Sequence, residues 1–180
     1  MAHGARPAGM TAVSKISRSA LTVYRVTRAI HPAFDGTGTA RFGARWTSPG
    51  RVAIYAAGSY AGALMEILAH ARRHDLKVAY QCLVIVIPEH VRVIAVEAKA
   101  APGWDSRDYV VSRGVGDRWL QEKKSAVLRV PSVTGSPHEY HFIFNPLHAD
   151  VSKLKLGKPH AVTWDDRLLA QRPARQPPGQ

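Results

Sequence analysis

The sequence predicts an α+β protein with a single domain, in which a compact mixed β-core is flanked by helices. A chain of 180 residues favours one domain with a substantial core. Its 46% content of hydrophobic residues is typical of a globular protein. It contains many short β-rich runs and only two helical segments of modest length, so an alternating βαβ architecture is not expected.

The predicted strands are short β-rich runs bounded by proline, glycine or other turn residues. They lie at 21–26, 52–57, 79–87, 91–96, 126–130 and 139–144, with two short edge strands at 153–156 and 161–164. In the first strand, alternation places Arg25 on the face opposite Tyr24 and Val26. We therefore expect the guanidinium to point away from the apolar side chains beside it.

Two helices are predicted. Ser59 is a suitable N-cap for a helix over about residues 60–73. A second helix is predicted within 107–124, although Gly114 and Gly116 are unfavourable in a helix.

The two ends of the chain differ in composition from its middle. Residues 1–19 are small, polar and basic, so we expect a flexible basic leader. Residues 171–180 are rich in proline, arginine and glutamine, and we expect a disordered tail. The folded domain is therefore predicted to span residues 20–170.

The chain is strongly basic, with a net charge of +12 and an isoelectric point of 10.3. Residues 1–80 contain 11 Lys and Arg against 3 Asp and Glu, a net charge of +8, whereas residues 81–180 contain 14 against 10, a net charge of +4. Three kinds of partner suit such a field: nucleic acid, an anionic small ligand or an acidic protein. A solvated basic surface is the alternative for most of the lysines.

Cysteine usage and hydropathy indicate a compartment. Cys82 is the only cysteine, so an intrachain disulfide is excluded and a cytoplasmic location is the default expectation. No run approaches the roughly 18 consecutive apolar residues of a membrane span. The first 19 residues lack the apolar stretch of a secretory signal, so no membrane partner is expected.

A glycine-rich loop between Gly36 and Gly50 carries Arg41 and Arg45. Glycine lets the backbone approach an anion closely, and guanidinium groups bind phosphate through paired hydrogen bonds. Together with Arg25, these arginines indicate a site for a phosphorylated ligand. The loop matches neither a dinucleotide-binding fingerprint, since no helix start is expected after Gly36, nor a P-loop. Pairing of the arginines with surface acids is the alternative.

Glu66 is a single acid in an otherwise apolar helical segment. Burial of a carboxylate is costly unless the group is paired or functional. Two interpretations remain open. Glu66 forms a salt bridge with a nearby arginine, or it supports a cationic, oxocarbenium-like transition state.

No metal site is predicted. His70 and His74 are four apart on a predicted helix, and His138 and His141 flank a strand start. The helix lacks a His-Glu-x-x-His arrangement, and the adjacent arginines would repel a cation. Ser132 lacks the Gly-x-Ser-x-Gly setting of a hydrolase nucleophile, so a ligand hydrogen bond or a turn is expected for it.

An ordered series of short motifs extends from about Leu21 to Leu156. It consists of Tyr24-Arg25-Val26, Gly43-Ala44-Arg45-Trp46, Ile54-Tyr55, Leu64-Met65-Glu66, Val130-Pro131-Ser132 and Asn145-Pro146-x-His148. In order and spacing the series resembles the RES domain, a family named for an arginine, a glutamate and a serine. The sequence departs from the family at Ala44, where a second glycine is usual, and at Thr47, where asparagine is common. Both departures put the shape of the pocket in doubt.

The resemblance implies a fold like that of ADP-ribosyltransferases and a toxin of a bacterial type II toxin–antitoxin pair. The implied partner is an Xre-type helix-turn-helix antitoxin, with DNA contacted only through it. The implied reaction breaks the nicotinamide–ribose bond of NAD⁺, with water, inorganic phosphate or a protein side chain as acceptor. NAD⁺ is then the substrate, and no further cofactor is implied.

The resemblance also implies roles for individual residues. Glu66 would face the ribose and stabilise the oxocarbenium ion, with Arg25 and Tyr55 as the other catalytic residues. Arg25 and Arg45 would hold the pyrophosphate or lie beside it, and Tyr55 would pack on the nicotinamide side. The residues expected to bind the ligand are Arg25, Arg45, Tyr55, Ser132 and Asn145.

Other classes remain as alternatives. A basic nucleic-acid-binding protein or ribonuclease toxin is supported by charge alone, because no RNA-binding signature of interleaved basic and aromatic residues is found. A third interpretation is an interaction module whose pocket is no longer active.

Overall fold

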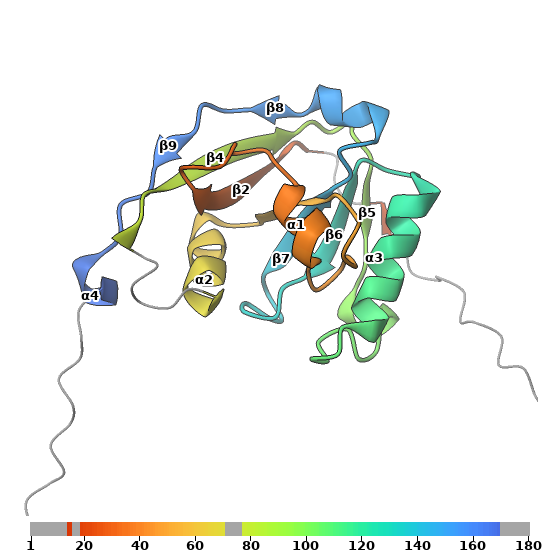
Figure 1. Cartoon of the computed structure of the whole chain (residues 1–180). Helices are drawn as coiled ribbons and strands as arrows, with labels where there is room; N and C mark the ends of the chain where they lie inside the picture. The colour runs from red at the N-terminus through yellow and green to blue at the C-terminus, as the bar shows by residue number, and fades with distance from the viewer. Residues whose placement is uncertain (1–13, 16–18, 71–76, 170–180) are drawn as a thin grey trace, which may run out of the picture.

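The computed structural model describes residues 14–15, 19–70 and 77–169 (Figure 1). The strands are β1 (Ser14–Lys15), β2 (Leu21–Arg28), β3 (Ile54–Ala57), β4 (Tyr80–Ile87), β5 (Val93–Ala95), β6 (Val127–Pro131), β7 (Tyr140–Phe144), β8 (Lys155–Leu156) and β9 (His160–Ala161). The helices are α1 (Thr37–Phe42), α2 (Tyr60–His70), α3 (Val110–Glu122) and α4 (Asp166–Leu169), with 3-10 turns η2 (Ala98–Ala100) and η3 (Ala149–Lys153). The predicted α+β class with flanking helices is confirmed.

The strands form one mixed sheet. Its order is β1-β5-β6-β7-β3-β2-β4-β8, and β9 also pairs with β4. Neighbouring strands are antiparallel except β5 and β6, which are parallel. β2 and β4 pair over their full length, from Leu21↔Ile87 to Arg28↔Tyr80. β3 likewise pairs with β7 over its full length.

The sheet opens between β2 and β3. In the described part of the chain, Tyr24↔Ala57 is the one residue pair that joins these two strands. The β2–β4 half and the β3–β7–β6–β5 half therefore diverge from this point. Because the backbone ladder is interrupted here, side chains can reach groups that a continuous sheet would occupy.

Both faces of the sheet are covered by core residues. Phe144 and Ile143 are neighbours on β7 and pack into different clusters, as strand alternation requires. Val23 joins Phe144 in the cluster on one face. Trp119 of α3 joins Ile143 on the other face. Ala63 of α2 packs in a third cluster against β2 and β4. Figure 1 shows α2 and α3 at opposite flanks of the sheet, with α1 between them.

Gly116 explains how α3 comes to lie against the loop that precedes β3. A Cβ at this position would lie 1.7 Å from the Trp46 carbonyl oxygen, so only glycine fits. Ser112 of the same helix donates a hydrogen bond of 2.7 Å to the Arg45 carbonyl. A residue unfavourable for helix propensity is thus required by tertiary packing, and this packing fixes the backbone of Arg45.

The expectation that no helix starts after Gly36 was wrong, because α1 occupies Thr37–Phe42. Asp35 accepts hydrogen bonds from the backbone N–H and the hydroxyl of Thr37, which stabilises the first turn. Gly43 has a φ of 68° and ends the helix before Trp46. A loop was predicted here because residues that end a helix, Gly43 among them, follow within a few residues of Gly36, which leaves room only for a helix of six residues.

The predicted cap of α2 is confirmed, since the Gly62 N–H donates a hydrogen bond of 2.9 Å to Ser59 Oγ. The predicted end of this helix, at 71–73, lies outside the described residues. The predicted leader and tail also lie outside them, apart from Ser14–Lys15 in β1 and Ser19. No helix of the described ranges is long and apolar enough to cross a membrane.

Candidate active site

A cavity of about 600 Å³ lies where the sheet opens. Its walls come from the strands β2, β3 and β7 and from the helices α1, α2 and α3. Four of the residues predicted from the sequence line it, namely Arg25, Arg45, Tyr55 and Glu66. The volume falls within the range of about 300–1,000 Å³ that is usual for small-molecule sites. Segments far apart in the sequence are thus brought to one place.

Arg25 bridges the opening between β2 and β3. Its Nη1 donates a hydrogen bond of 2.9 Å to the Tyr55 carbonyl of β3. Its Nε and Nη2 donate bonds of 2.9 Å to the carbonyls of Ala33 and Asp35. Burial lowers the pKa of Arg25, and the Asp35 charge opposes that shift. Because carbonyl oxygens rather than a carboxylate satisfy the guanidinium, its positive charge is only weakly compensated beside the cavity.

Arg45 and Arg113 place two more guanidiniums at the α3 side of the cavity. Arg45 Nη1 donates hydrogen bonds to the carbonyls of Ser106 (3.0 Å) and Trp104 (3.3 Å). Arg113 Nε donates one of 3.0 Å to the carbonyl of Ala44. The Tyr109 ring lies under both, with its centroid 4.6 Å from Arg45 Cζ and 5.0 Å from Arg113 Cζ. Both arginines line the cavity, and each has guanidinium N–H donors that these hydrogen bonds do not use.

Tyr55 lines the cavity, and its hydroxyl is held within the protein. The hydroxyl lies 3.0 Å from Thr47 Oγ1. Burial raises the pKa of Tyr55 well above its usual value, so the phenol stays protonated. Thr47 occupies the position where asparagine is common in the family, and here its hydroxyl fixes the tyrosine.

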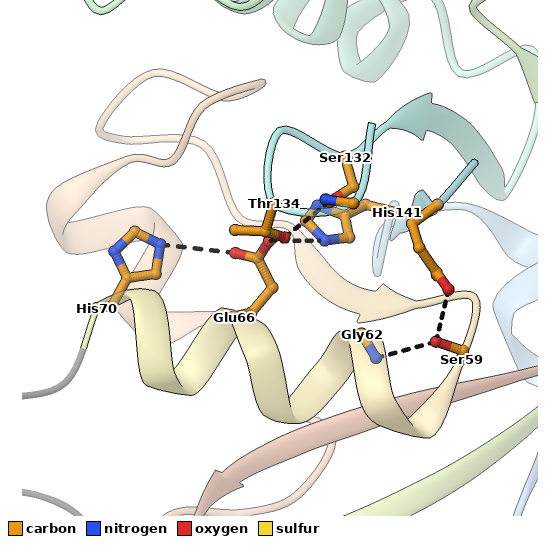
Figure 2. A network of polar contacts seen from close by, with 9 residues as sticks. Ser59, Gly62, Glu66, His70, Ser132, Thr134 and His141 are labelled. Atoms are coloured by element: carbon orange, nitrogen blue, oxygen red, sulfur yellow. Dashed lines mark hydrogen bonds and ion pairs between the residues drawn. The ribbon is translucent and has the colours of Figure 1, made fainter. Parts of the chain in front are cut away.

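Glu66 is held by three side chains from three parts of the chain (Figure 2). Thr134 Oγ1 donates a hydrogen bond to Oε1. His141 Nε2 of β7 lies 3.2 Å from Oε1, and His70 Nε2 of α2 lies 3.6 Å from Oε2. Burial opposes ionisation, but the hydrogen bonds from His141, His70 and Thr134 outweigh it and lower the pKa of Glu66 far below its usual value. The carboxylate is therefore ionised, and its partners are histidines and a threonine rather than an arginine.

Ser132 lies beside this network and does not line the cavity. The residue is 2% exposed, and its Oγ lies 2.9 Å from Thr134 Oγ1. Ser132 therefore contacts the residue that holds Glu66. Asn145 is also 2% exposed, and it hydrogen-bonds the backbone of Leu120 and Leu147. The structure does not bring Asn145 to the cavity.

Sequence reasoning missed three residues of the site: Arg113, Thr134 and His141. His141 was considered only as part of a metal pair with His138. Among the residues that the structure describes, no group of three metal-ligating side chains is found, and His74 lies outside them. The sequence does contain one indication of this site, because His141 is a polar residue at the start of an apolar strand. In the sheet, His141 lies opposite Ala57 of β3.

The α+β domain places one ionised carboxylate and three guanidiniums around a single cavity; these groups belong to Glu66, Arg25, Arg45 and Arg113. This arrangement is that of a small enzyme domain. The RES domain matches residues 22–165, so the chain belongs to the RES domain family. The predicted family is confirmed.

Named relatives agree with this assignment. The chain is 31% identical over 139 residues to the "Prs ADP-ribosylating toxin" of Sphingobium sp. (strain YBL2), covering 75% of this chain and 86% of the relative. It is 32% identical over 137 residues to "Toxin Res" of Pseudomonas putida, covering 75% and 92%. The crystal structure of the M. tuberculosis MbcT–MbcA toxin–antitoxin complex matches with a TM-score of 0.70 and 23% identity, over 83% of this chain and 87% of that chain. The fold is shared with that structure.

Proposed function

We propose that this chain is the toxin of a toxin–antitoxin pair and an enzyme that breaks the nicotinamide–ribose bond of NAD⁺. The observation that carries the proposal is an ionised Glu66 in the same cavity as Arg25 and Arg45. The names of the relatives, which are toxins and in one case an ADP-ribosylating toxin, support it. They do not favour the nucleic-acid-binding or ribonuclease alternative.

The proposed reaction needs a negative charge beside the ribose and does not need a general acid. Nicotinamide leaves NAD⁺ as a neutral molecule, so no general acid has to protonate it. The positive charge that forms on the ribose is stabilised by a fixed carboxylate in a site with restricted water. Glu66 is suited to this role because its partners hold it in one position and keep it ionised.

The arginines divide into two roles. Arg45 and Arg113 hold the diphosphate, because each keeps unused N–H donors at the cavity wall. Arg25 contributes its charge from a fixed position, because three carbonyls already engage it. Tyr55 supplies a ring for the nicotinamide side. Ser132 acts through Thr134, and Asn145 has no ligand contact in this proposal.

The proposed partner is an antitoxin that masks the toxin. The net charge of +12 suits an acidic antitoxin, and we propose an Xre-type helix-turn-helix protein in this role. The solved toxin–antitoxin complex with the same fold supports an antitoxin partner. DNA would then be contacted through the antitoxin alone, and we propose the cytoplasm, where NAD⁺ is abundant, as the location. NAD⁺ is the substrate, and no separate cofactor is proposed.

The proposed function is tested by measuring the release of nicotinamide from NAD⁺. Purified protein is incubated with NAD⁺, with and without inorganic phosphate, and free nicotinamide is measured. Release establishes cleavage, and dependence on phosphate identifies phosphorolysis. Intact NAD⁺ in both arms, with degradation of added RNA, would overturn the proposal in favour of the ribonuclease alternative.

A further inference from the structure

A second, smaller cavity adjoins the first. Its volume is about 190 Å³, too small for a dinucleotide. Ala57, Thr134 and His141 line both cavities. Thr134 and His141 are also the residues that contact Glu66 Oε1. The small cavity therefore lies against the group that is expected to face the ribose.

The walls of the small cavity are mostly apolar. Ala57, Ala61 and Met65 contribute aliphatic surface. Met65 is 50% exposed, so it lies at the mouth. A long aliphatic side chain could lay its stem along such a wall while its end reaches the interior.

The charged group inside is Glu139. Its Oε1 accepts a hydrogen bond of 2.9 Å from Ser59 Oγ, which Figure 2 shows next to Gly62. Among the described residues, no hydrogen-bond donor is found on Oε2. A Cβ at Gly62 would lie 3.1 Å from Oε2, so the missing side chain leaves room beside this oxygen. The cavity thus offers one open carboxylate oxygen at the end of an apolar slot.

We propose that the small cavity is the acceptor subsite and that it takes a cationic protein side chain, a lysine ammonium or an arginine guanidinium. This inference rests on the proposed function, because it names the acceptor of the same reaction. An open carboxylate oxygen forms a charge-assisted hydrogen bond with a cation. The same charge, with Glu66 close by, repels phosphate. The structure therefore favours transfer to protein over phosphorolysis.

The transfer joins the acceptor nitrogen to the ribose C1′. The bond between the nicotinamide nitrogen and the ribose C1′ breaks, and its electron pair leaves with neutral nicotinamide. The acceptor nitrogen of the bound cation first gives one proton to the Glu139 carboxylate, which passes it to solvent. The electron pair that this leaves on the nitrogen then forms the new bond to C1′. No oxidant, reductant or further reactant is required.

The experiment measures how the products are partitioned. The full chain is incubated with NAD⁺ and Nα-acetyl-arginine amide, Nα-acetyl-lysine amide, the neutral isostere Nα-acetyl-citrulline amide, or inorganic phosphate. Nicotinamide and each ADP-ribosyl product are quantified by mass spectrometry. We expect an adduct with at least one cationic probe and none with citrulline.

Two variants separate the charge of Glu139 from its structural role. In Glu139→Gln we expect the ratio of adduct to nicotinamide to fall about tenfold, because the charge-assisted bond is lost. In Ser59→Ala the hydroxyl that binds Oε1 is removed while the carboxylate stays. We expect this ratio to stay within about twofold of wild type, since the open oxygen is unaffected.

The outcomes are distinct. If nicotinamide is released but only ADP-ribose or its phosphate ester forms, the acceptor inference is overturned while the proposed function stands. Equal loss of adduct in both variants also overturns it, because Glu139 would then serve only to fix the start of α2. If no nicotinamide is released with any probe, the proposed function fails and the acceptor inference fails with it.

Discussion

The two ends of the large cavity are built differently. At the α2 end, Glu66 is held by other side chains, those of Thr134, His141 and His70. At the α3 end, Arg45 and Arg113 are held by backbone carbonyls and by the Tyr109 ring. Side-chain partners tune the protonation of the group they hold, whereas carbonyl partners fix a position and leave the charge in place. The first end is thus suited to chemistry and the second to binding.

The largest expected effect is at the α2 end. Glu66→Gln keeps the size of the side chain but removes its charge. Nicotinamide release should fall by about 10²–10³-fold, as for the loss of one preorganised electrostatic group in other enzymes. Release is measured on purified protein, and an unchanged thermal midpoint is the control for folding. Toxicity in cells should be lost in parallel, and a variant that still depleted NAD⁺ would contradict the role of Glu66.

The next effect concerns Arg25, which belongs to neither end. Arg25→Met removes three hydrogen bonds that join β2 to β3 and to the 33–35 segment. At about 1 kcal/mol for each bond, the free energy of unfolding should fall by roughly 3 kcal/mol. Urea denaturation measures it, with Arg41→Met as the control, since Arg41 is an exposed arginine of the same region. A similar loss in both variants would show that Arg25 has no special part in holding the sheet together.

At the α3 end, the expected change is in KM. Arg45→Met and Arg113→Met should each raise KM for NAD⁺ about tenfold, because one charge-assisted contact to phosphate is lost. We expect kcat to change little, since neither residue lies next to Glu66 in the contacts described. Steady-state kinetics separate the two parameters. A fall in kcat at unchanged KM would place these arginines in the chemical step instead.

The smallest effect is on the pH profile. The pKa of Glu66 is lowered in the folded protein, so its carboxylate stays ionised as the pH falls through the ordinary glutamate value of about 4.3. In His141→Gln a main cause of this shift is removed, and the pKa of Glu66 should rise towards that value. The acid limb of kcat/KM should therefore move to higher pH. An acid limb at the same pH in both proteins would indicate that a different group controls it.

The sequence was sufficient for the local features of the fold. The alternation in 21–26 placed Arg25 on the correct face, and Ser59 caps α2 as expected. α1 was missed because a short helix between glycines owes its stability to Asp35 and to neighbouring segments. Gly116 seemed a weakness of α3 because propensity does not include the carbonyl that lies against it.

The site was predictable in part for the same reason. Glu66 and Arg45 stand out in any reading of the chain, since a lone acid in an apolar segment and an arginine among glycines are local anomalies. Two partners of Glu66 are distant in the sequence, since Thr134 is 68 residues away and His141 is further. Only the pairing of β3 with β7 brings them near Glu66. Asn145 was carried over by resemblance and lies in the core instead.

Two side-chain contacts connect both ends of α2 to the loop of residues 132–139, between β6 and β7. Ser59, at the start of the helix, binds the Glu139 side chain, whereas Glu66, near its other end, binds Thr134. Helix and loop should consequently come apart as one cooperative unit, and their amide protons should exchange with deuterium at a common rate. A protein that separated this loop from the helix would remove the contacts that hold the Glu66 carboxylate without entering the cavity.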